Sequence, residues 1–191
     1  MMGDHWPHTE VSVNGTPEPP SVLSDGSRLA PTIDGVRVER VITHADHRGR
    51  LFEVVNHAHE FWAAPVVQTY VFTVRPGAVK GWGVHDGKDD RYCLISGELL
   101  VLLYDGRGHS PTSGLVQEVF LSPDCDRLLL IPRGVWHLSL NVGTEMCVGM
   151  NHPTVAYNYA EPDKRLMAWD DPSSPVDVRR YLRPQVTDPT Q

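Results

Sequence analysis

The sequence lacks long hydrophobic runs. No stretch of its 191 residues reaches the ~18 consecutive apolar positions that a membrane-spanning helix requires, so we expect no membrane partner. The N-terminal segment, MMGDHWPHTEVSVNG, also lacks a basic stretch followed by an apolar one, which argues against a secretory signal peptide. Together these absences predict a cytoplasmic protein.

Cysteine is scarce. The chain has three cysteines, Cys93, Cys125 and Cys147, and no two of them form a C-x-x-C pair. An odd number without paired spacing argues against a disulfide framework and against a zinc–thiolate site. We therefore expect reduced thiols, which agrees with a cytoplasmic location.

Basic residues are fewer than acidic ones. The 17 Lys and Arg residues face 24 Asp and Glu residues, which gives a formal net charge of −7 at pH 7. A chain with this balance is not expected to bind nucleic acid or an anionic membrane over a broad surface. A small basic pocket for a phosphorylated ligand remains compatible with it.

Long helical periodicity is missing as well, while turn-forming residues are frequent, with 16 glycines and 16 prolines. Tyr70, Phe72 and Val74 alternate with their neighbours at the period of two that is typical of a half-buried strand. Ten short strands separated by turns predict an all-β sandwich or barrel, most simply a jelly roll. The expected strands are 36–42, 51–55, 66–74, 79–84, 91–96, 99–104, 115–121, 127–131, 136–141 and 145–150.

The two ends differ from this pattern. Residues 1–31 are rich in proline, serine and glycine and show no periodic apolar pattern, so we expect a disordered tail that cannot offset its ordering entropy. Residues 179–191 are expected to form a second loose tail. One domain, 32–178, remains between them.

A turn motif in the second half of the domain carries a histidine. The sequence Pro132-x-Gly134-x-x-His137-x-x-x-Asn141 places His137 just after a tight turn, on the returning strand. This spacing resembles the second signature of the cupins, small jelly-roll barrels also described as double-stranded β-helices. The resemblance implies that His137 points into the barrel, although a hairpin with an ordinary core histidine has the same spacing.

The first cupin signature is incomplete. Metal-binding cupins carry two histidines one residue apart there, but this sequence has only His85, and the pair His57-Ala58-His59 lies too early in the chain. Two histidines alone do not complete a metal site. A metal site made by His85, His137 and a further carboxylate stays open as an alternative.

Four segments together make a sharper match. In their order and spacing they resemble the dTDP-4-dehydrorhamnose 3,5-epimerase family, a branch of the cupins, over about residues 32–178. The second segment, which reads D-x-R-x-x-S-P-T-x-G, is the most distinctive. The four segments are Asp46–Glu53, Asp105–Gly114, Leu121–Pro123 with Ile131–His137, and Trp169–Pro172.

The resemblance implies an isomerase that uses no metal or other cofactor and acts on a nucleotide-linked 4-keto-6-deoxy sugar. A base removes a proton from the carbon beside the ketone, an enolate forms, and an acid returns a proton to the other face. His85 falls on the family's base, and Asp171 falls on the carboxylate that holds this base in its tautomer. His137 matches a second histidine of the pocket.

The resemblance also implies a substrate-binding set and a homodimer. Arg48, Glu53 and Gln68 match residues that contact the nucleotide in the family, partly from the neighbouring subunit. Other matches depart from the family. Trp82 replaces an arginine, and Asp90 replaces the lysine that holds the enolate oxygen, a role for which Lys88 or Arg91 stays open.

The family's acid tyrosine is also missing, because Asn151-His152 occupies its place. We expect His152 or Tyr157 to act as the acid, and Trp82 and Tyr159 to line the pocket. Two alternatives to an epimerase stay open. One is a sugar-binding cupin without catalysis, and the other is the metal-dependent cupin that uses His85 and His137.

Overall fold

The computed structural model of the protein describes residues 20–24, 29–125 and 128–182. The expected tails therefore lie largely outside the described residues. The chain divides into two compact units, Met1–Pro31 and Thr32–Gln191, and every sheet described below belongs to the second unit. None of the helices in the described ranges is long and apolar enough to cross a bilayer.

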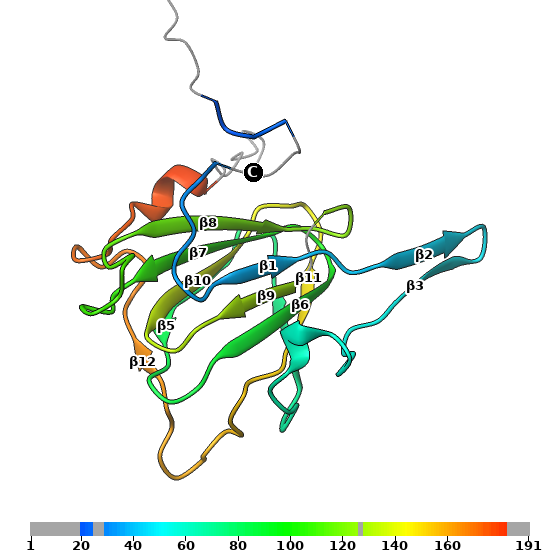
Figure 1. The fold of residues 1–191 in the computed structure, drawn as a ribbon. Helices are drawn as coiled ribbons and strands as arrows, with labels where there is room; N and C mark the ends of the chain where they lie inside the picture. Colours follow the sequence, from blue (N-terminus) through cyan, green and yellow to red (C-terminus); the bar gives the residue numbers. More distant parts are fainter. Residues whose placement is uncertain (1–19, 25–28, 126–127, 183–191) are drawn as a thin grey trace, which may run out of the picture. The chain divides into compact units, whose positions relative to one another are not determined.

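The described residues form twelve strands and two short 3₁₀ helices (Figure 1). The predicted all-β class is confirmed. The elements are β1 (Arg37–Glu39), β2 (Thr43–Asp46), β3 (Gly49–Phe52), η1 (Glu60–Trp62), β4 (Tyr70–Val74), β5 (Val79–Val84), β6 (Asp90–Ser96), β7 (Leu99–Asp105), β8 (Val116–Leu121), β9 (Leu128–Ile131), β10 (Val135–Asn141), β11 (Cys147–Asn151), β12 (Arg165–Leu166) and η2 (Val178–Tyr181).

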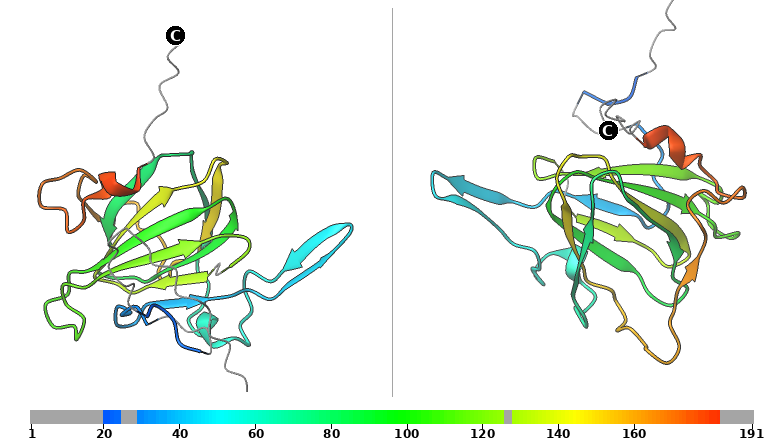
Figure 2. Two further views of the ribbon diagram at one scale, coloured as in Figure 1. Left: turned by 90° about the horizontal axis from the view of Figure 1, so that it is seen from above. Right: turned by 180° about the vertical axis from the view of Figure 1, so that it is seen from behind.

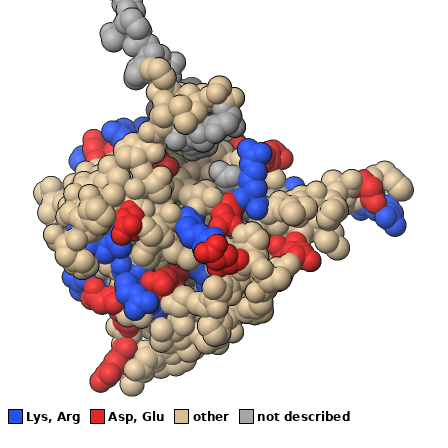
Figure 3. Space-filling model, in the orientation of Figure 1, with Lys and Arg blue, Asp and Glu red and all other residues tan. Residues whose placement is uncertain are grey.

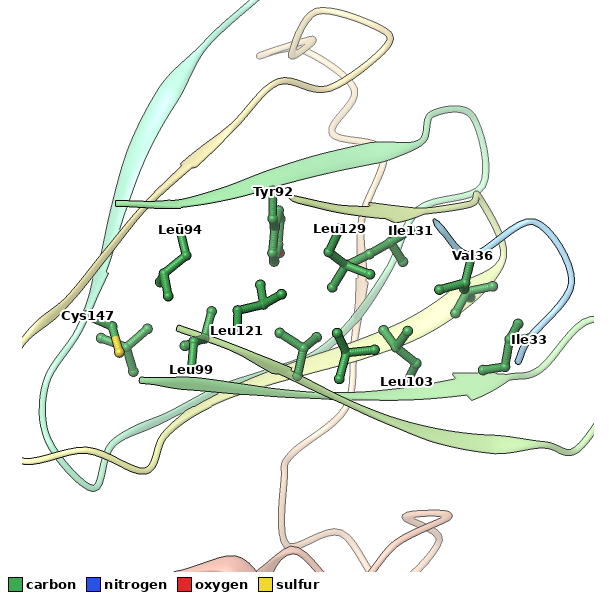
Figure 4. Packing of buried hydrophobic residues seen from close by; sticks show 14 residues of the cluster. Ile33, Val36, Tyr92, Leu94, Leu99, Leu103, Leu121, Leu129, Ile131 and Cys147 are labelled. Atoms are coloured by element: carbon green, nitrogen blue, oxygen red, sulfur yellow. The ribbon is translucent and has the colours of Figure 1, made fainter. Parts of the chain in front are cut away.

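Two five-stranded sheets face each other (Figure 2). One has the order β1-β9-β6-β11-β4 and the other the order β12-β5-β10-β7-β8, and neighbouring strands are antiparallel throughout. Apolar side chains from both sheets fill the space between them, among them Leu94, Leu103, Leu121 and Leu129 (Figure 4). This interior is the hydrophobic core that holds the two sheets together.

The period of two in each strand decides which side chains reach this interior. On β6, Tyr92 and Leu94 belong to the inner cluster, whereas Cys93 belongs to a cluster on the outer face that η1 covers with Phe61 and Trp62. The other sheet has an outer cluster of its own, in which Val176 and Val178 pack against its strands. Each sheet therefore has an inner and an outer buried face.

The remaining two strands, β2 and β3, pair only with each other in the sheets of the described chain and form a hairpin arm that extends away from the barrel (Figures 1 and 2). Apolar side chains on and beside the arm face solvent, with Ile42 80% and Leu51 64% exposed. The sequence prediction had a strand running to residue 42 and another from 51 to 55, and so missed this hairpin. Its strands carry polar residues on both faces, without the usual apolar alternation.

Charge is mixed on the surface. On the face shown in Figure 3, basic and acidic side chains are interspersed and no single basic field stands out. This distribution agrees with the net charge of −7 and gives no electrostatic footprint for nucleic acid on that face.

The distinctive D-x-R-x-x-S-P-T segment builds the loop after β7. The buried carboxylate of Asp105 accepts hydrogen bonds from Arg107 Nε at 2.8 Å, Ser110 Oγ at 2.6 Å and Thr112 Oγ1 at 2.6 Å. Burial opposes ionisation of this carboxyl, but the hydrogen bonds outweigh it and hold the pKa of Asp105 well below its usual range. The motif therefore has a structural role in this chain.

We expect Asp105→Asn to lower the free energy of unfolding by about 3 kcal/mol at neutral pH. The amide carries no negative charge, and its NH₂ group would face the donors that the carboxylate now accepts from. The folded-state pKa is depressed, so this stability is present above the ordinary carboxyl pKa of ~4 and is lost as the pH falls below it. Urea unfolding at pH 7 and pH 3 checks this. A stability difference between variant and wild type that stays constant over that range contradicts the assignment.

Candidate active site

Two histidines and a carboxylate converge at one end of the barrel interior. His85 follows β5, Asp90 begins β6 and His137 lies on β10. Asp90 Oδ2 lies 3.5 Å from His85 Nε2 and 3.6 Å from His137 Nε2. All three residues are buried, with exposed fractions of 7%, 2% and 7%, and the two rings stack with their centroids 5.7 Å apart.

The local backbone explains why these side chains meet. His137 pairs with Gly83 in the β10–β5 ladder, and the Pro132–Gly134 turn docks on the next strand end because Gly134 N donates to His85 O at 2.7 Å. Gly81 has a φ of 122°, and a Cβ there would lie 2.8 Å from both His137 O and Leu138 Cα. Only glycine permits this close crossing of β5 and β10.

Backbone carbonyls fix the tautomer of each ring. Asp163 O lies in hydrogen-bond contact with His85 Nδ1, and Val135 O lies 3.4 Å from His137 Nδ1. A carbonyl only accepts, so these geometries assign the proton to Nδ1 and leave the Nε2 lone pair free. Both Nε2 atoms lie within 3.6 Å of Asp90 Oδ2.

The loop that supplies Asp163 is anchored beside His85. The Asp163 carboxylate accepts from the backbone N–H of Asp86 at 2.9 Å and of Gly87 at 3.0 Å. Burial works against the anion, but these hydrogen bonds bring the pKa of Asp163 below its ordinary value. The anchored loop therefore keeps the Asp163 carbonyl beside His85 Nδ1.

The next residue, Lys164, brings a cation to the site. A Cβ built on Gly83 would lie 3.6 Å from Lys164 Nζ and 3.7 Å from His137 Nε2, so both nitrogens border the same small space. Burial, above all, lowers the pKa of His137 to about 4, and the nearby Lys164 charge acts in the same direction. His137 is therefore neutral at pH 7.

Asn151 connects Asp90 to a tyrosine. Its Nδ2 donates to Asp90 Oδ1 at 2.8 Å and to Tyr70 Oη at 2.7 Å. Burial and the nearby Asp90 charge raise the pKa of Tyr70, which keeps its phenol protonated at neutral pH. Since Tyr70 accepts from Asn151, its own hydroxyl proton is free to be donated elsewhere.

The expected pair of His85 and Asp171 is not formed. The Asp171 carboxylate instead accepts from Ser173 N at 2.8 Å and Ser173 Oγ at 2.6 Å, in a turn before the segment that covers the outer face of β5 and β10. Asp90 takes the place predicted for Asp171 beside the histidine. The resemblance to the family matches Asp171 with a catalytic carboxylate, but in this structure Asp171 lies in a turn.

Trp82 does not line the pocket either. It is fully buried in the outer cluster and donates from Nε1 to Ser174 Oγ at 3.0 Å. Trp82 lies one position from Gly83, which borders His137, so the alternation of β5 turns the indole to the opposite face. The predicted role in substrate binding is therefore wrong for this residue.

His152 lies on the outer face of the sheet that contains β6 and β11. Its ring packs edge-on against Trp62 with centroids 5.1 Å apart, and its Nδ1 lies 2.8 Å from Thr69 Oγ1. It follows Asn151, whose side chain reaches Asp90, so alternation turns His152 away from the site. Arg91 shares that outer face and donates to three backbone carbonyls. A role of His152 as the catalytic acid does not fit this placement.

The remaining predicted residues lie around the loops. Tyr157 and Tyr159 form an edge-to-face pair with centroids 4.9 Å apart, and Lys88 Nζ lies 5.6 Å from the Tyr157 ring centroid. Gln68 Oε1 accepts from Tyr157 N at 2.7 Å, which ties this loop to the segment before β4. Tyr157 is 41% exposed, so it borders solvent, unlike the buried histidine cluster.

The structure does not bring Arg48 or Glu53 to the histidines within this chain. Arg48 sits on the β2–β3 arm, with 79% of its side chain exposed, and pairs with Asp46 of the same arm at 2.6 Å. Glu53 follows the arm and accepts from Asn56 Nδ2 at 2.8 Å. Neither makes a contact with the site in the single chain.

Four residues of the site were not predicted as functional: Tyr70, Asp90, Asn151 and Lys164. Strand alternation could have placed the first three inside, because each shares its strand face with core residues. Lys164 lies on a loop, where no sequence period exists. The cluster now contains an unprotonated imidazole nitrogen, a carboxylate beside it, a phenol and an ammonium group, which together suffice for proton transfer at an acidic C–H bond.

Comparison with known proteins gives a consistent picture. The family model described as dTDP-4-dehydrorhamnose 3,5-epimerase matches residues 30–188. The chain is 34% identical over 143 residues to the spore coat polysaccharide biosynthesis protein SpsL of Bacillus subtilis, covering 73% of this chain and 91% of that protein. It is 30% identical over 141 residues to the probable low-salt glycan biosynthesis epimerase Agl13 of Haloferax volcanii, covering 73% and 90%.

A solved structure agrees with the fold. The crystal structure of a dTDP sugar isomerase from Desulfovibrio desulfuricans superposes with a TM-score of 0.69 at 26% identity, and the match covers 73% of this chain and 88% of that one. The predicted cupin jelly roll is thereby confirmed.

Proposed function

Because the chain belongs to the dTDP-4-dehydrorhamnose 3,5-epimerase family, we propose that it epimerises a nucleotide-linked 4-keto-6-deoxy sugar by removing a proton beside the ketone. The chain is an isomerase of the sugar-nucleotide epimerase class, like its relative of glycan biosynthesis. The family description and the similar dTDP sugar isomerase support dTDP as the nucleotide. The observation that carries the mechanism is the buried His85–Asp90 contact.

His85 is the proposed base. Its Nδ1 proton is held by the Asp163 carbonyl, so Nε2 offers its lone pair to the substrate's C–H. When Nε2 takes the proton, the ring becomes an imidazolium 3.5 Å from the Asp90 carboxylate. The opposite charge stabilises this cation in a buried site, where it would otherwise be costly.

Lys164 is the proposed partner of the enolate oxygen. Proton removal places negative charge on the ketone oxygen, which needs a preorganised donor. Asp90 occupies the position at which the family carries a lysine, so a cation must come from elsewhere. Lys164 Nζ borders the same space as His137 Nε2, beside the Gly83 backbone.

Tyr70 is the proposed acid. Its phenol stays protonated and accepts from Asn151, so it has a proton to return to the carbanion carbon. Asn151 also holds Asp90, which places base and acid on one hydrogen-bonded frame. Tyr157, on the loop beside Lys88, is the second candidate for this role.

A homodimer completes the nucleotide site in this proposal. The β2–β3 arm extends from the barrel with exposed apolar residues, and Arg48 at its tip is 79% exposed, where a second copy of the chain can contact it. Arg48 and Glu53 would contact the nucleotide of the partner's site, while Gln68 contributes from the same chain.

The base is tested by deuterium uptake from heavy water into a dTDP-linked 4-keto-6-deoxyhexose, followed by NMR. We expect exchange at a carbon next to the ketone, and a rate ~10²–10⁴-fold lower in His85→Ala. Asp171→Ala is the matched control and should retain the wild-type rate, since its carboxylate accepts hydrogen bonds from Ser173, away from the histidine cluster. The absence of exchange from every candidate sugar would contradict the epimerase proposal and favour a sugar-binding protein.

Variants of Tyr70 and Lys164 separate the acid from the enolate contact. Tyr70→Phe should keep deuterium exchange but lose most of the inverted product, because the base still works and the acid is missing. Lys164→Gln should slow exchange and product formation together, by ~10²–10³-fold, because the enolate itself is less stable. Equal losses of exchange and inversion in Tyr70→Phe would refute the acid role.

Subunit complementation tests the arm. Arg48→Ala and His85→Ala should each be weakly active alone. A mixture unfolded and refolded together should recover activity, because a mixed dimer holds one site with both native residues. Mixing the two proteins without refolding serves as the control. No recovery in the refolded mixture, with both variants folded, means that Arg48 serves its own chain or has no role.

A further inference from the structure

Neutral His85 has a single ring proton, and two acceptors lie near the two ring nitrogens. The Asp163 carbonyl is in hydrogen-bond contact with Nδ1, and the Asp90 carboxylate lies 3.5 Å from Nε2. The hydrogen bond that one ring nitrogen makes decides which nitrogen carries the proton. Only an unprotonated Nε2 can take a proton from a substrate, so His85 is a base only while its own proton stays on the Asp163 side.

Asp90 is intrinsically the stronger of these two acceptors. A charged carboxylate accepts more strongly than a neutral carbonyl, so at equal distances the proton would go to Nε2. Geometry reverses this preference, because 3.5 Å is longer than the ~2.7–3.2 Å of an ordinary N–H···O hydrogen bond, whereas the carbonyl is in contact with Nδ1. A small retreat of the carbonyl would therefore protonate His85 on the nitrogen that has to stay free.

The side chain of Asp163 holds this carbonyl in place. Its carboxylate accepts from the backbone N–H of Asp86 at 2.9 Å and of Gly87 at 3.0 Å, and these are the two residues that directly follow His85. The fit is close, since a Cβ built on Gly87 would lie 3.3 Å from Asp163 Oδ2. Asp163 thus contacts the base at two points, the ring through its carbonyl and the adjoining backbone through its carboxylate.

We propose that Asp163 is a positioning residue, whose carboxylate keeps His85 in the Nδ1–H tautomer and so keeps Nε2 available as a base. The catalytic consequence rests on the proposed function, whereas the tautomer itself can be measured without a substrate. Asp163 acts through His85 and touches no reacting atom. Because Lys164 is the next residue, the same anchor also fixes the main chain that carries the proposed enolate contact.

Other contacts hold the rest of this loop, so the carboxylate can be removed without releasing the whole segment. At its start, Asp89 N donates to Thr154 Oγ1 at 2.9 Å, and Thr154 N donates to Asp89 O at 3.0 Å. At its end, Arg165 pairs with Val84 in the β12–β5 ladder. Loss of the Asp163 carboxylate should therefore free the carbonyl locally and leave the fold intact.

The test measures the tautomer of His85 directly. Long-range ¹H–¹⁵N NMR of histidine-labelled full-length protein distinguishes protonated from unprotonated ring nitrogens, and His85→Ala identifies the His85 signals. Above the ordinary histidine pKa of ~6.5, we expect Nδ1–H in the wild type. In Asp163→Ala we expect the proton on Nε2, toward Asp90. Asp163→Asn keeps one acceptor oxygen and should give a mixture of the two forms.

Deuterium exchange measures the catalytic consequence. Asp163→Ala should lower the exchange rate at saturating substrate by ~10²-fold, as a displaced catalytic group does, and should leave KM nearly unchanged. Asp86→Asn is the matched control. It changes an exposed carboxylate that pairs with Arg165 but keeps the backbone N–H that Asp163 binds, so it should match the wild type in both measurements.

Three results overturn the positioning role, provided that circular dichroism shows the variants folded. One is a wild-type His85 with its proton on Nε2 or on both nitrogens. Another is an Nδ1–H tautomer that persists in Asp163→Ala, since the β12–β5 pairing would then suffice to place the carbonyl. The third is a lost tautomer without any loss of exchange. The absence of exchange in the wild type contradicts the epimerase instead, and the NMR result still decides whether Asp163 sets the tautomer.

Discussion

The contact of the buried Asp90 carboxylate with two imidazoles is the interaction on which the rest of the site depends. The Asp90 carboxylate lies 3.5 Å and 3.6 Å from the two Nε2 atoms. Asp90 is 2% exposed, so solvent screens its charge little. The backbone carbonyls behind each ring and Asn151 beside the carboxylate all serve to orient this contact.

The alternation of side chains along the barrel strands positions the residues of this contact. Alternation sends Asp90, Asn151 and His137 inward and their neighbours Arg91, His152 and Trp136 outward. The outward residues pack under the segments that cover the two sheets, η1 on one and residues 176–178 on the other. This packing fixes the strands that carry the polar cluster. The loop after β11 adds Lys164, whose Nζ borders the same space as His137 Nε2.

The sequence predicted the fold well because strands, turns and the four motif segments are local in the chain. It also selected His85 and His137, both of which lie in the cluster. It failed where side-chain direction or loop geometry decides. Asp171 aligned with a catalytic carboxylate but lies in a turn, Trp82 and His152 point outward, and Lys164 depends on a loop that no periodicity describes. The D-x-R-x-x-S-P-T segment, the most recognisable motif, turned out to stabilise a loop.

The most direct measurement is a crystal structure of the chain with a dTDP-linked 4-keto sugar bound. The account predicts that the C–H next to the ketone lies within reach of His85 Nε2, with the ketone oxygen toward Lys164 and the opposite face toward Tyr70. A sugar bound beside Asp171 and Trp82, away from the His85–Asp90 contact, would contradict it.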